Sequence, residues 1–213
     1  MPLITAAQVR AVGVPSLSGT GADATEIEPL IARADSALAR WCGYPFASAA
    51  RPTLESATYV LYLTGLALEP RRLPLPFDGR RVTTITSVYD DPGLDWESGD
   101  LVASSDYTLR ADRGDLLLSS SSVQGGWTSD PEEAVKVTMV AGWTATGGAN
   151  PVPLEVEQAM ILLVKHWMRL KTEAGHTSVS AGAGNVGTRD EDIPASVQQL
   201  MHPYRLVGVG PFG

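Results

Sequence analysis

Residues 182–187, GAGNVG, match the G-x-G-x-x-G pattern of dinucleotide-binding loops. Such a loop binds a pyrophosphate only where a strand enters it and a helix leaves it, because the backbone amides and the helix dipole must face the phosphate. Here TRDEDIP follows, which brings three acidic residues close to any phosphate and leaves only a short helix behind the loop. We therefore predict that residues 174–192 form a flexible, glycine-rich loop and bind no nucleotide.

The tripeptide RGD at residues 113–115 is a second candidate, because this sequence can mediate adhesion to cell-surface receptors. Arg113 and Gly114 also stand between two strand-like segments, YTL and LLL, where a hairpin would turn. The N-terminal residues MPLITAAQVR contain neither a basic start nor an apolar run, so no secretory signal is predicted. We therefore favour a tight turn over an adhesive role.

Carboxylates crowd the segment YDDPGLDWESGD, and such a group could gather around calcium. An EF-hand loop needs ligands at fixed positions, a central glycine and a final bidentate glutamate. The spacing here does not supply those ligands in register, so an acidic, solvated loop is the favoured interpretation. The acidic residues concerned are Asp90, Asp91, Asp95, Glu97 and Asp100.

The three histidines give no support to a metal site. His166, His176 and His202 are far apart and form no pair with metal-ligand spacing. The sequence also contains no G-x-S-x-G elbow, no Walker loop and no H-E-x-x-H motif. We expect no catalytic residue, no metal, no cofactor and no enzymatic activity.

Composition narrows the class of protein further. The 213 residues carry 24 acidic and 16 basic side chains, a formal charge of −8. An acidic surface repels the phosphate backbone, which argues against sequence-specific nucleic acid binding but is compatible with a protein that DNA merely passes. The single cysteine, Cys42, excludes an intrachain disulfide, and no stretch approaches the roughly 18 apolar residues of a membrane span. We expect a soluble intracellular product, because a single unpaired cysteine suits a reducing cytoplasm.

Two long helices are predicted to form the scaffold that positions the functional residues of the chain. The first is predicted over residues 25–41, where Thr25 and Glu28 have the spacing of a capping box. The second is predicted to begin at Pro153 and carries an apolar face over more than half its circumference. Neither helix can bury its apolar face alone, so we expect the two to pair. The apolar stripe of the first consists of Ile27, Leu30, Ile31, Ala34, Leu38 and Trp41.

Between the two helices, residues 52–143 are rich in β-branched and aromatic residues, with recurring turn dipeptides. Six short strands are predicted, in ATYVLYLTG, RRLPLPF, RVTTITSVY, DYTLRA, GDLLLSS and AVKVTMVAGW. A short closing helix begins at Pro194 and ends at Pro203. The predicted class is α+β: a helical core of residues 1–51 and 144–213, with a small antiparallel β-barrel or sandwich inserted as residues 52–143.

The closing sequence IPASVQQLMHPYRL, the two-helix core and SDYTLRADRGDLLL before VKVTMVAGW together resemble a known family. They are similar to the head–tail connector (adaptor, or head-completion) proteins of tailed bacteriophages and gene transfer agents. The step from Trp41 to Pro45 and the tryptophan at position 167 also fit that pattern. The most specific part of the resemblance lies in the closing segment, at Pro194, Val197, Leu200, Pro203, Tyr204 and Arg205. The larger β insertion departs from the smallest members, which are almost purely helical.

The resemblance implies a structural subunit of the virion neck that is made in the host cytoplasm. It implies a homo-oligomeric ring, expected to be a dodecamer, that docks on the portal protein and extends the DNA channel toward the stopper and tail. DNA would pass through the lumen without sequence-specific binding, and no membrane is involved. Deleting residues 203–213 is expected to abolish portal binding without unfolding the monomer. The interaction residues proposed for the portal or a neighbouring subunit are Tyr204, Arg205, Leu206, Val207, Phe212, Trp167 and Arg169.

Two other functions remain open at this point. The first is a tail terminator or similar tail-completion protein, which would bind tail rings instead of the portal. The second is a carbohydrate-binding β module, with Trp96, Trp127 and Trp143 as platforms for sugar rings.

Overall fold

A computed structural model describes residues 2–12, 24–47, 51–77, 81–110, 113–122, 124–145, 147–148, 150–174 and 193–206. The chain divides into two compact units. Unit 1 consists of Met1–Cys42 and Thr144–Arg205, and unit 2 consists of Gly43–Trp143 and Leu206–Gly213. None of the helices in the described ranges is long and apolar enough to cross a lipid bilayer.

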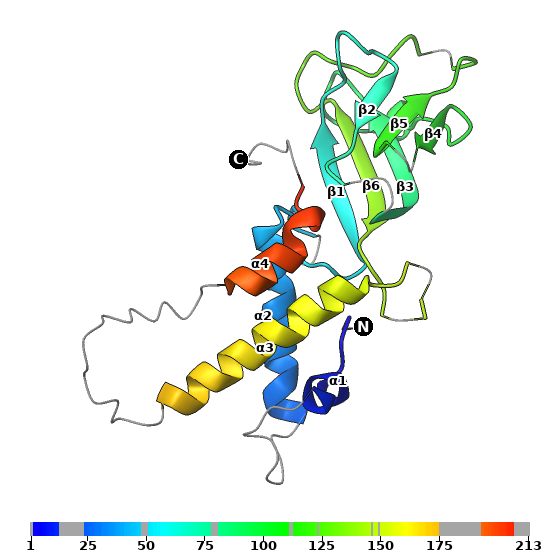
Figure 1. Cartoon of the computed structure of the whole chain (residues 1–213). Coiled ribbons are helices and arrows are strands. Elements are labelled where there is room, and N and C mark those ends of the chain that lie inside the picture. Colours follow the sequence, from blue (N-terminus) through cyan, green and yellow to red (C-terminus); the bar gives the residue numbers. More distant parts are fainter. Residues whose placement is uncertain are drawn as a thin grey trace, which may run out of the picture. The chain divides into compact units, whose positions relative to one another are not determined.

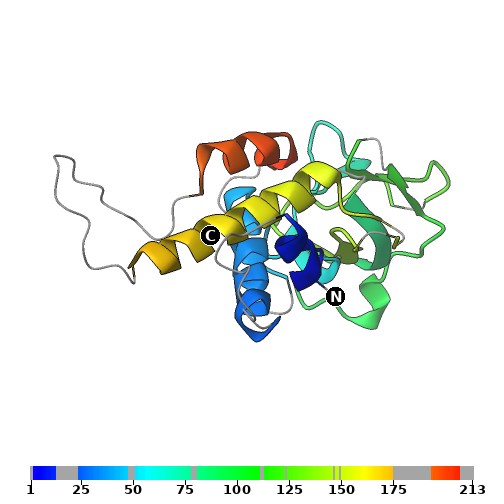
Figure 2. The same ribbon diagram turned by 60° about the horizontal axis from the view of Figure 1, so that its bottom comes forward.

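Unit 1 is built from helices. α2 and α3 cross and pack against each other, α4 lies against α3, and α1 lies beside the first turns of α2 (Figures 1 and 2). The predicted pairing of the two long helices is therefore confirmed. The elements are α1 (Ala6–Ala11), α2 (Ala24–Trp41), α3 (Leu154–Ala174), α4 (Ala195–Met201) and the 3-10 helix η4 (His202–Tyr204).

The helix ends differ from the predicted ones in small ways. α2 begins at Ala24, so Thr25 lies inside the helix and is not its N-cap. A capping box is present at α1, where the Thr5 side chain accepts from the Gln8 amide and the Gln8 side chain accepts from the Thr5 amide. Pro194 precedes α4 as its N-cap, and the chain continues through Pro203 as η4.

The core of unit 1 lies where the predicted apolar stripes of α2 and α3 meet. The stripe positions of α2 are buried except Leu30 and Trp41, which are half-buried. α4 adds Val197 and Met201, both fully buried. Burial of this many apolar side chains is the main source of stability for a helical unit of this size. From α3 the core receives Val156, Ala159, Met160, Leu163 and Val164.

Unit 2 contains the six predicted strands, and all six are confirmed (Figure 1). They form two three-stranded antiparallel sheets, ordered β1-β6-β3 and β2-β5-β4. Neither sheet closes on itself among the described residues, so the barrel form is not confirmed and the observed architecture is two open sheets. The strands are β1 (Ala57–Leu63), β2 (Arg72–Pro74), β3 (Val82–Asp90), β4 (Tyr107–Arg110), β5 (Asp115–Leu118) and β6 (Val135–Ala141), with a short 3-10 helix, η3 (Ser98–Asp100), before β4.

β6 is the central strand of the larger sheet, and alternate side chains of β6 face the core of unit 2. Val135, Val137 and Met139 are fully buried, as the predicted alternation requires. An aromatic cluster extends this core: the Phe77 ring lies 4.8 Å from the Tyr59 ring and 5.5 Å from the Tyr44 ring. These rings pack edge to face, the arrangement that aromatic quadrupoles favour.

Candidate interaction surface

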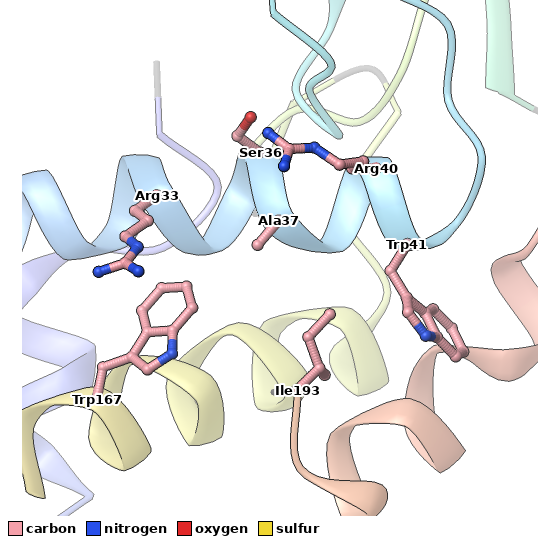
Figure 3. Close-up of a pocket in the computed structure, with 7 residues that line it drawn as sticks. All are labelled: Arg33, Ser36, Ala37, Arg40, Trp41, Trp167 and Ile193. Carbon is pink, nitrogen blue, oxygen red and sulfur yellow. The ribbon is translucent and has the colours of Figure 1, made fainter. Parts of the chain in front are cut away.

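A groove in unit 1 runs between α2 and α3 and reaches Ile193, two residues before α4 (Figure 3). Its volume is about 390 Å³. We call it the α2–α3 groove. Two arginines and two tryptophans dominate a lining of Arg33, Ser36, Ala37, Arg40, Trp41, Trp167 and Ile193.

Trp167 stands at one end of this groove. Its side chain rises from α3, and the guanidinium of Arg33 descends from α2 to lie 4.7 Å from the ring centroid (Figure 3). This is a cation–π contact, worth on the order of 1 kcal/mol at a partly solvated site. Trp167 is only 6% exposed, and its indole Nε1 has no hydrogen-bond partner among the described residues. The indole nitrogen lies on the side of the ring that faces Ile193 (Figure 3).

Trp41 stands at the other end and links the groove to the closing segment, residues 193–206. The guanidinium of Arg205 lies 4.9 Å from the centroid of the Trp41 ring. One residue earlier, the Tyr204 hydroxyl donates to Glu155 Oε2 at 3.2 Å. The two contacts fasten the end of the closing segment to the last turn of α2 and the first turn of α3.

The predicted interaction residues therefore fall into groups. The structure places Trp167 in the groove and Arg205 against Trp41, which also lines the groove. The Tyr204 hydroxyl contacts Glu155 in the first turn of α3. Arg169 is exposed and comes two residues after Trp167, a spacing that places the two on different faces of α3. Leu206 is half-buried and belongs to unit 2. Val207 and Phe212 lie outside the described residues.

Sequence reasoning missed Arg33 and Arg40. Arg33, Ala37, Arg40 and Trp41 follow one another at positions i, i+4, i+7 and i+8 of α2, the spacing of a single helix face. This face lies beside the buried apolar stripe of the same helix. This periodic face is the signal that the sequence offers for the two arginines, but it is the same for arginines that are simply solvated.

The sequence matches the head completion protein family over residues 2–207. The chain belongs to this family. The predicted resemblance is thereby confirmed at the level of the family. No curated protein matches the chain.

Two solved structures of similar fold come from gene transfer agent (GTA) particles. A chain in the neck of an empty GTA particle computed with C6 symmetry has a TM-score of 0.59 and 17% identity, covering 98% of this chain and 92% of that one. A chain in the virion of a native GTA particle has a TM-score of 0.51 and 19% identity, covering 92% of this chain and 84% of that one. At these identities the likeness concerns the fold.

The RGD motif of this head completion protein has a structural role. Gly114 has a φ of +65° and closes the β4–β5 hairpin, so the predicted tight turn is confirmed. Asp115 is fully buried, and its carboxylate accepts bonds from Arg72 Nε at 2.5 Å and from Arg110 Nε and Nη2 at 2.6 Å. A buried, doubly paired aspartate is not available to a receptor.

The acidic segment forms a structured loop, residues 91–101, which we call the acidic loop. The Asp91 carboxylate accepts bonds from the backbone amides of Gly93, Asp95 and Trp96 at 2.6, 2.7 and 3.0 Å. These bonds lower the pKa of Asp91 and explain how the loop holds Leu94 and Trp96 at φ values of +63° and +49°. Carboxylate oxygens of Asp91, Asp95 and Asp100 lie within 4.8 Å of one another.

The carbohydrate alternative finds little support in the tryptophans of this head completion protein. Trp127 is 3% exposed and Trp143 is 4% exposed, so neither presents a ring face to a sugar in this structure. Trp127 Nε1 donates to the Arg71 carbonyl at 3.1 Å, which is the contact of a core residue. Trp96 is half-buried.

Proposed function

We propose that this head completion protein is an adaptor subunit of the virion neck, forming a ring that docks on the portal and extends the DNA channel toward the stopper and tail. The family match over residues 2–207 carries the proposal, because it includes both units and the closing segment. The similar fold of a chain from a GTA neck, over 98% of this chain, supports the same location. The role is structural and requires no reactive pocket.

The proposed assembly is a ring of identical subunits. Each subunit of a ring contacts its neighbours through two different, complementary patches, unlike a twofold dimer. The similar chain comes from a neck computed with C6 symmetry, and the twelve subunits that we propose are compatible with it because six divides twelve. The net charge of −8 suits a subunit that lines a channel, because an acidic lumen attracts no phosphates and lets DNA slide.

We assign portal docking to the end of the closing segment. Tyr204 and Arg205 are engaged by Glu155 and Trp41 of their own chain, so their contacts fix the place from which the following residues leave unit 1. The sequence after them, LVGVGPFG, is apolar and small. We propose that Leu206, Val207 and Phe212 bury their side chains against the portal, where apolar area removed from water stabilises the complex.

The test is a chain that ends at Arg205. Its described contacts with α2 and α3 remain, so circular dichroism and thermal unfolding should match those of the full chain. Its binding to purified portal, measured by co-sedimentation, should fall at least tenfold because the apolar contact is lost. Full-strength portal binding would contradict the assignment.

A substitution set provides the matched control. Leu206→Ala, Val207→Ala and Phe212→Ala together should reproduce the loss of portal binding. Leu66→Ala and Leu68→Ala change exposed apolar side chains elsewhere and should leave it unchanged. Retention of tail-tube protein in place of portal would favour the tail-completion alternative.

A further inference from the structure

The α2–α3 groove holds unused hydrogen-bonding capacity. No described carboxylate lies within ion-pair distance of Arg33 or Arg40. Trp167 Nε1 is buried without a partner and faces the groove (Figure 3). A buried donor without a partner costs free energy on the order of 1–3 kcal/mol, so a ligand that accepts its hydrogen bond is favoured. The groove therefore points to an occupant with acceptor atoms.

The chemistry of the lining narrows the occupant to a carboxylate accompanied by apolar groups. Guanidinium groups bind carboxylates through paired hydrogen bonds and carry full positive charge. Between the arginines, Ala37, Ile193 and the tryptophan rings offer apolar surface. A peptide segment with acidic and aliphatic side chains in close succession matches both features.

The acidic loop of unit 2 has this composition. This loop connects β3 and β4, and its Asp95 and Glu97 are exposed. Leu94 and Leu101 of the same loop are 39% and 50% exposed. The carboxyl group of Asp95 has its pKa raised, first by the hydrogen bond to Asp91 and then by burial and the neighbouring negative charges. A cationic partner would relieve this crowding of like charges. The bonds to Asp91 hold the loop in one conformation, which lowers the entropy lost on binding.

We propose that the α2–α3 groove of one copy binds the acidic loop of the next copy, with Arg33 and Arg40 paired to Asp95 and Glu97. The proposal rests on the ring function proposed above and assigns the two different patches that a ring requires. One patch lies in unit 1 and the other in unit 2, so every subunit carries both halves of the contact. The contact can then be repeated from copy to copy.

A second copy explains the groove better than DNA does. A duplex presents a regular row of phosphates, and binding it requires several basic residues along one face. The groove instead combines two arginines with buried aromatic surface, and the whole chain carries a charge of −8. Aliphatic side chains next to carboxylates are features of the acidic loop and absent from a phosphate backbone.

Two complementary variants test the contact. The groove variant carries Arg33→Gln and Arg40→Gln, and the loop variant carries Asp95→Asn and Glu97→Gln. Each variant alone lacks one half of the contact and should remain unpaired in sedimentation velocity. Mixed together, the native groove of one and the native loop of the other should form a one-to-one pair and nothing larger.

The indole N–H resonance of Trp167 reports on the groove itself. In ¹⁵N-labelled loop variant, assigned through Trp167→Phe, this resonance should shift as unlabelled groove variant is added and should saturate at equimolar ratio. A chain with all four substitutions should cause no shift. Glu132→Gln with Glu133→Gln, which removes two exposed charges elsewhere in unit 2, should leave pairing of the full chain unchanged.

The outcomes decide between the possibilities. Absence of a pair in the mixture, or an equal Trp167 shift with the four-substitution chain, would overturn the proposal. If a double variant unfolds, Arg40→Gln and Glu97→Gln alone give the same test. Portal co-sedimentation separates this contact from the proposed function, because a chain that binds portal but does not pair contradicts only the groove–loop contact.

Discussion

At the scale of single residues, Asp115 shows how the fold can use a motif that looks functional. Its carboxylate is fully buried at the start of β5 and is held by arginines from β2 and β4. Burial raises the pKa of Asp115, but the hydrogen bonds and charges of Arg110 and Arg72 lower it more, so the net pKa lies below the ordinary value. One buried charge thus joins all three strands of the smaller sheet.

This arrangement predicts a pH-dependent stability. A carboxyl group whose folded pKa is depressed stabilises the fold above its unfolded pKa of about 3.9, and this contribution is lost as pH falls through the folded pKa. Asp115→Asn should therefore lower the free energy of unfolding at pH 7 by about 2 kcal/mol. This value is smaller than that for a fully buried ion pair, because both arginines are partly exposed to solvent. Urea denaturation between pH 7 and pH 3 measures the effect, and the variant should lose less stability over that range than the native chain.

Asp90 provides a control of opposite sign. Burial raises the pKa of Asp90, against the hydrogen bonds from Thr128 that lower it. Its contribution is largest below its unfolded pKa and declines as pH rises through the folded pKa. Asp90→Asn should make the loss of stability in acid steeper, whereas Asp115→Asn makes it shallower. Equal slopes for the two variants would contradict this account of both carboxylates.

At this scale the sequence predicts only part of the candidate surface. Trp167 was predicted from the resemblance, and the structure places it in the groove. Arg33 and Arg40 were not predicted, because two arginines on an exposed helix face are indistinguishable from solvated charges until a tryptophan from another helix is placed beside them. The role of Asp115 was equally hidden, since its partners Arg72 and Arg110 come from separate strands.

At the scale of elements, local pattern predicted much more. All six strands lie within the segments predicted from their β-branched, aromatic and aliphatic residues and the turn signals between them, and both long helices lie where apolar residues recur at helical spacing. How strands join into sheets depends on contacts between distant residues, which local alternation does not encode. For this reason the pattern gave the strands but not the two open sheets, β1-β6-β3 and β2-β5-β4.

The end of β6 shows one such distant contact, at Gly142. Its φ is +105°, and a Cβ atom there would lie 2.4 Å from the carbonyl oxygen of Glu55 and 2.9 Å from that of Leu54. Only glycine permits both the backbone conformation and the close approach of the segment before β1. Gly142→Ala should therefore cost roughly 3 kcal/mol or more in unfolding free energy, measured by urea denaturation.

Gly125 is the matched control for this substitution. A Cβ atom at Gly125 would have no atom within 4 Å, so Gly125→Ala should change stability by less than about 0.5 kcal/mol. Similar losses for the two variants would show that the approach of Glu55 to Gly142 is not what restricts this position.

At the scale of the whole molecule, the proposed assembly uses two contacts of different physical character. The groove–loop contact between copies pairs Arg33 and Arg40 with carboxylates at a partly solvated surface. The portal contact of Leu206 and the residues after it buries apolar groups. Charged contacts give orientation and register, and apolar burial gives affinity, so the combination suits a ring that must first align and then be retained.

Salt should separate the two contacts. Mobile ions screen exposed charges over about 8–10 Å at physiological ionic strength and over shorter distances as salt rises. Raising NaCl from about 0.05 to 0.5 M should weaken pairing of the groove and loop variants on the order of tenfold, because their contact depends on exposed charges. Portal binding by the full chain should change less than threefold, because apolar burial is not screened. Sedimentation of the mixed variants and portal co-sedimentation, run at the same salt concentrations, give both values. If portal binding is more sensitive to salt than the pairing is, the assignment of charged and apolar contacts to the two interfaces is reversed.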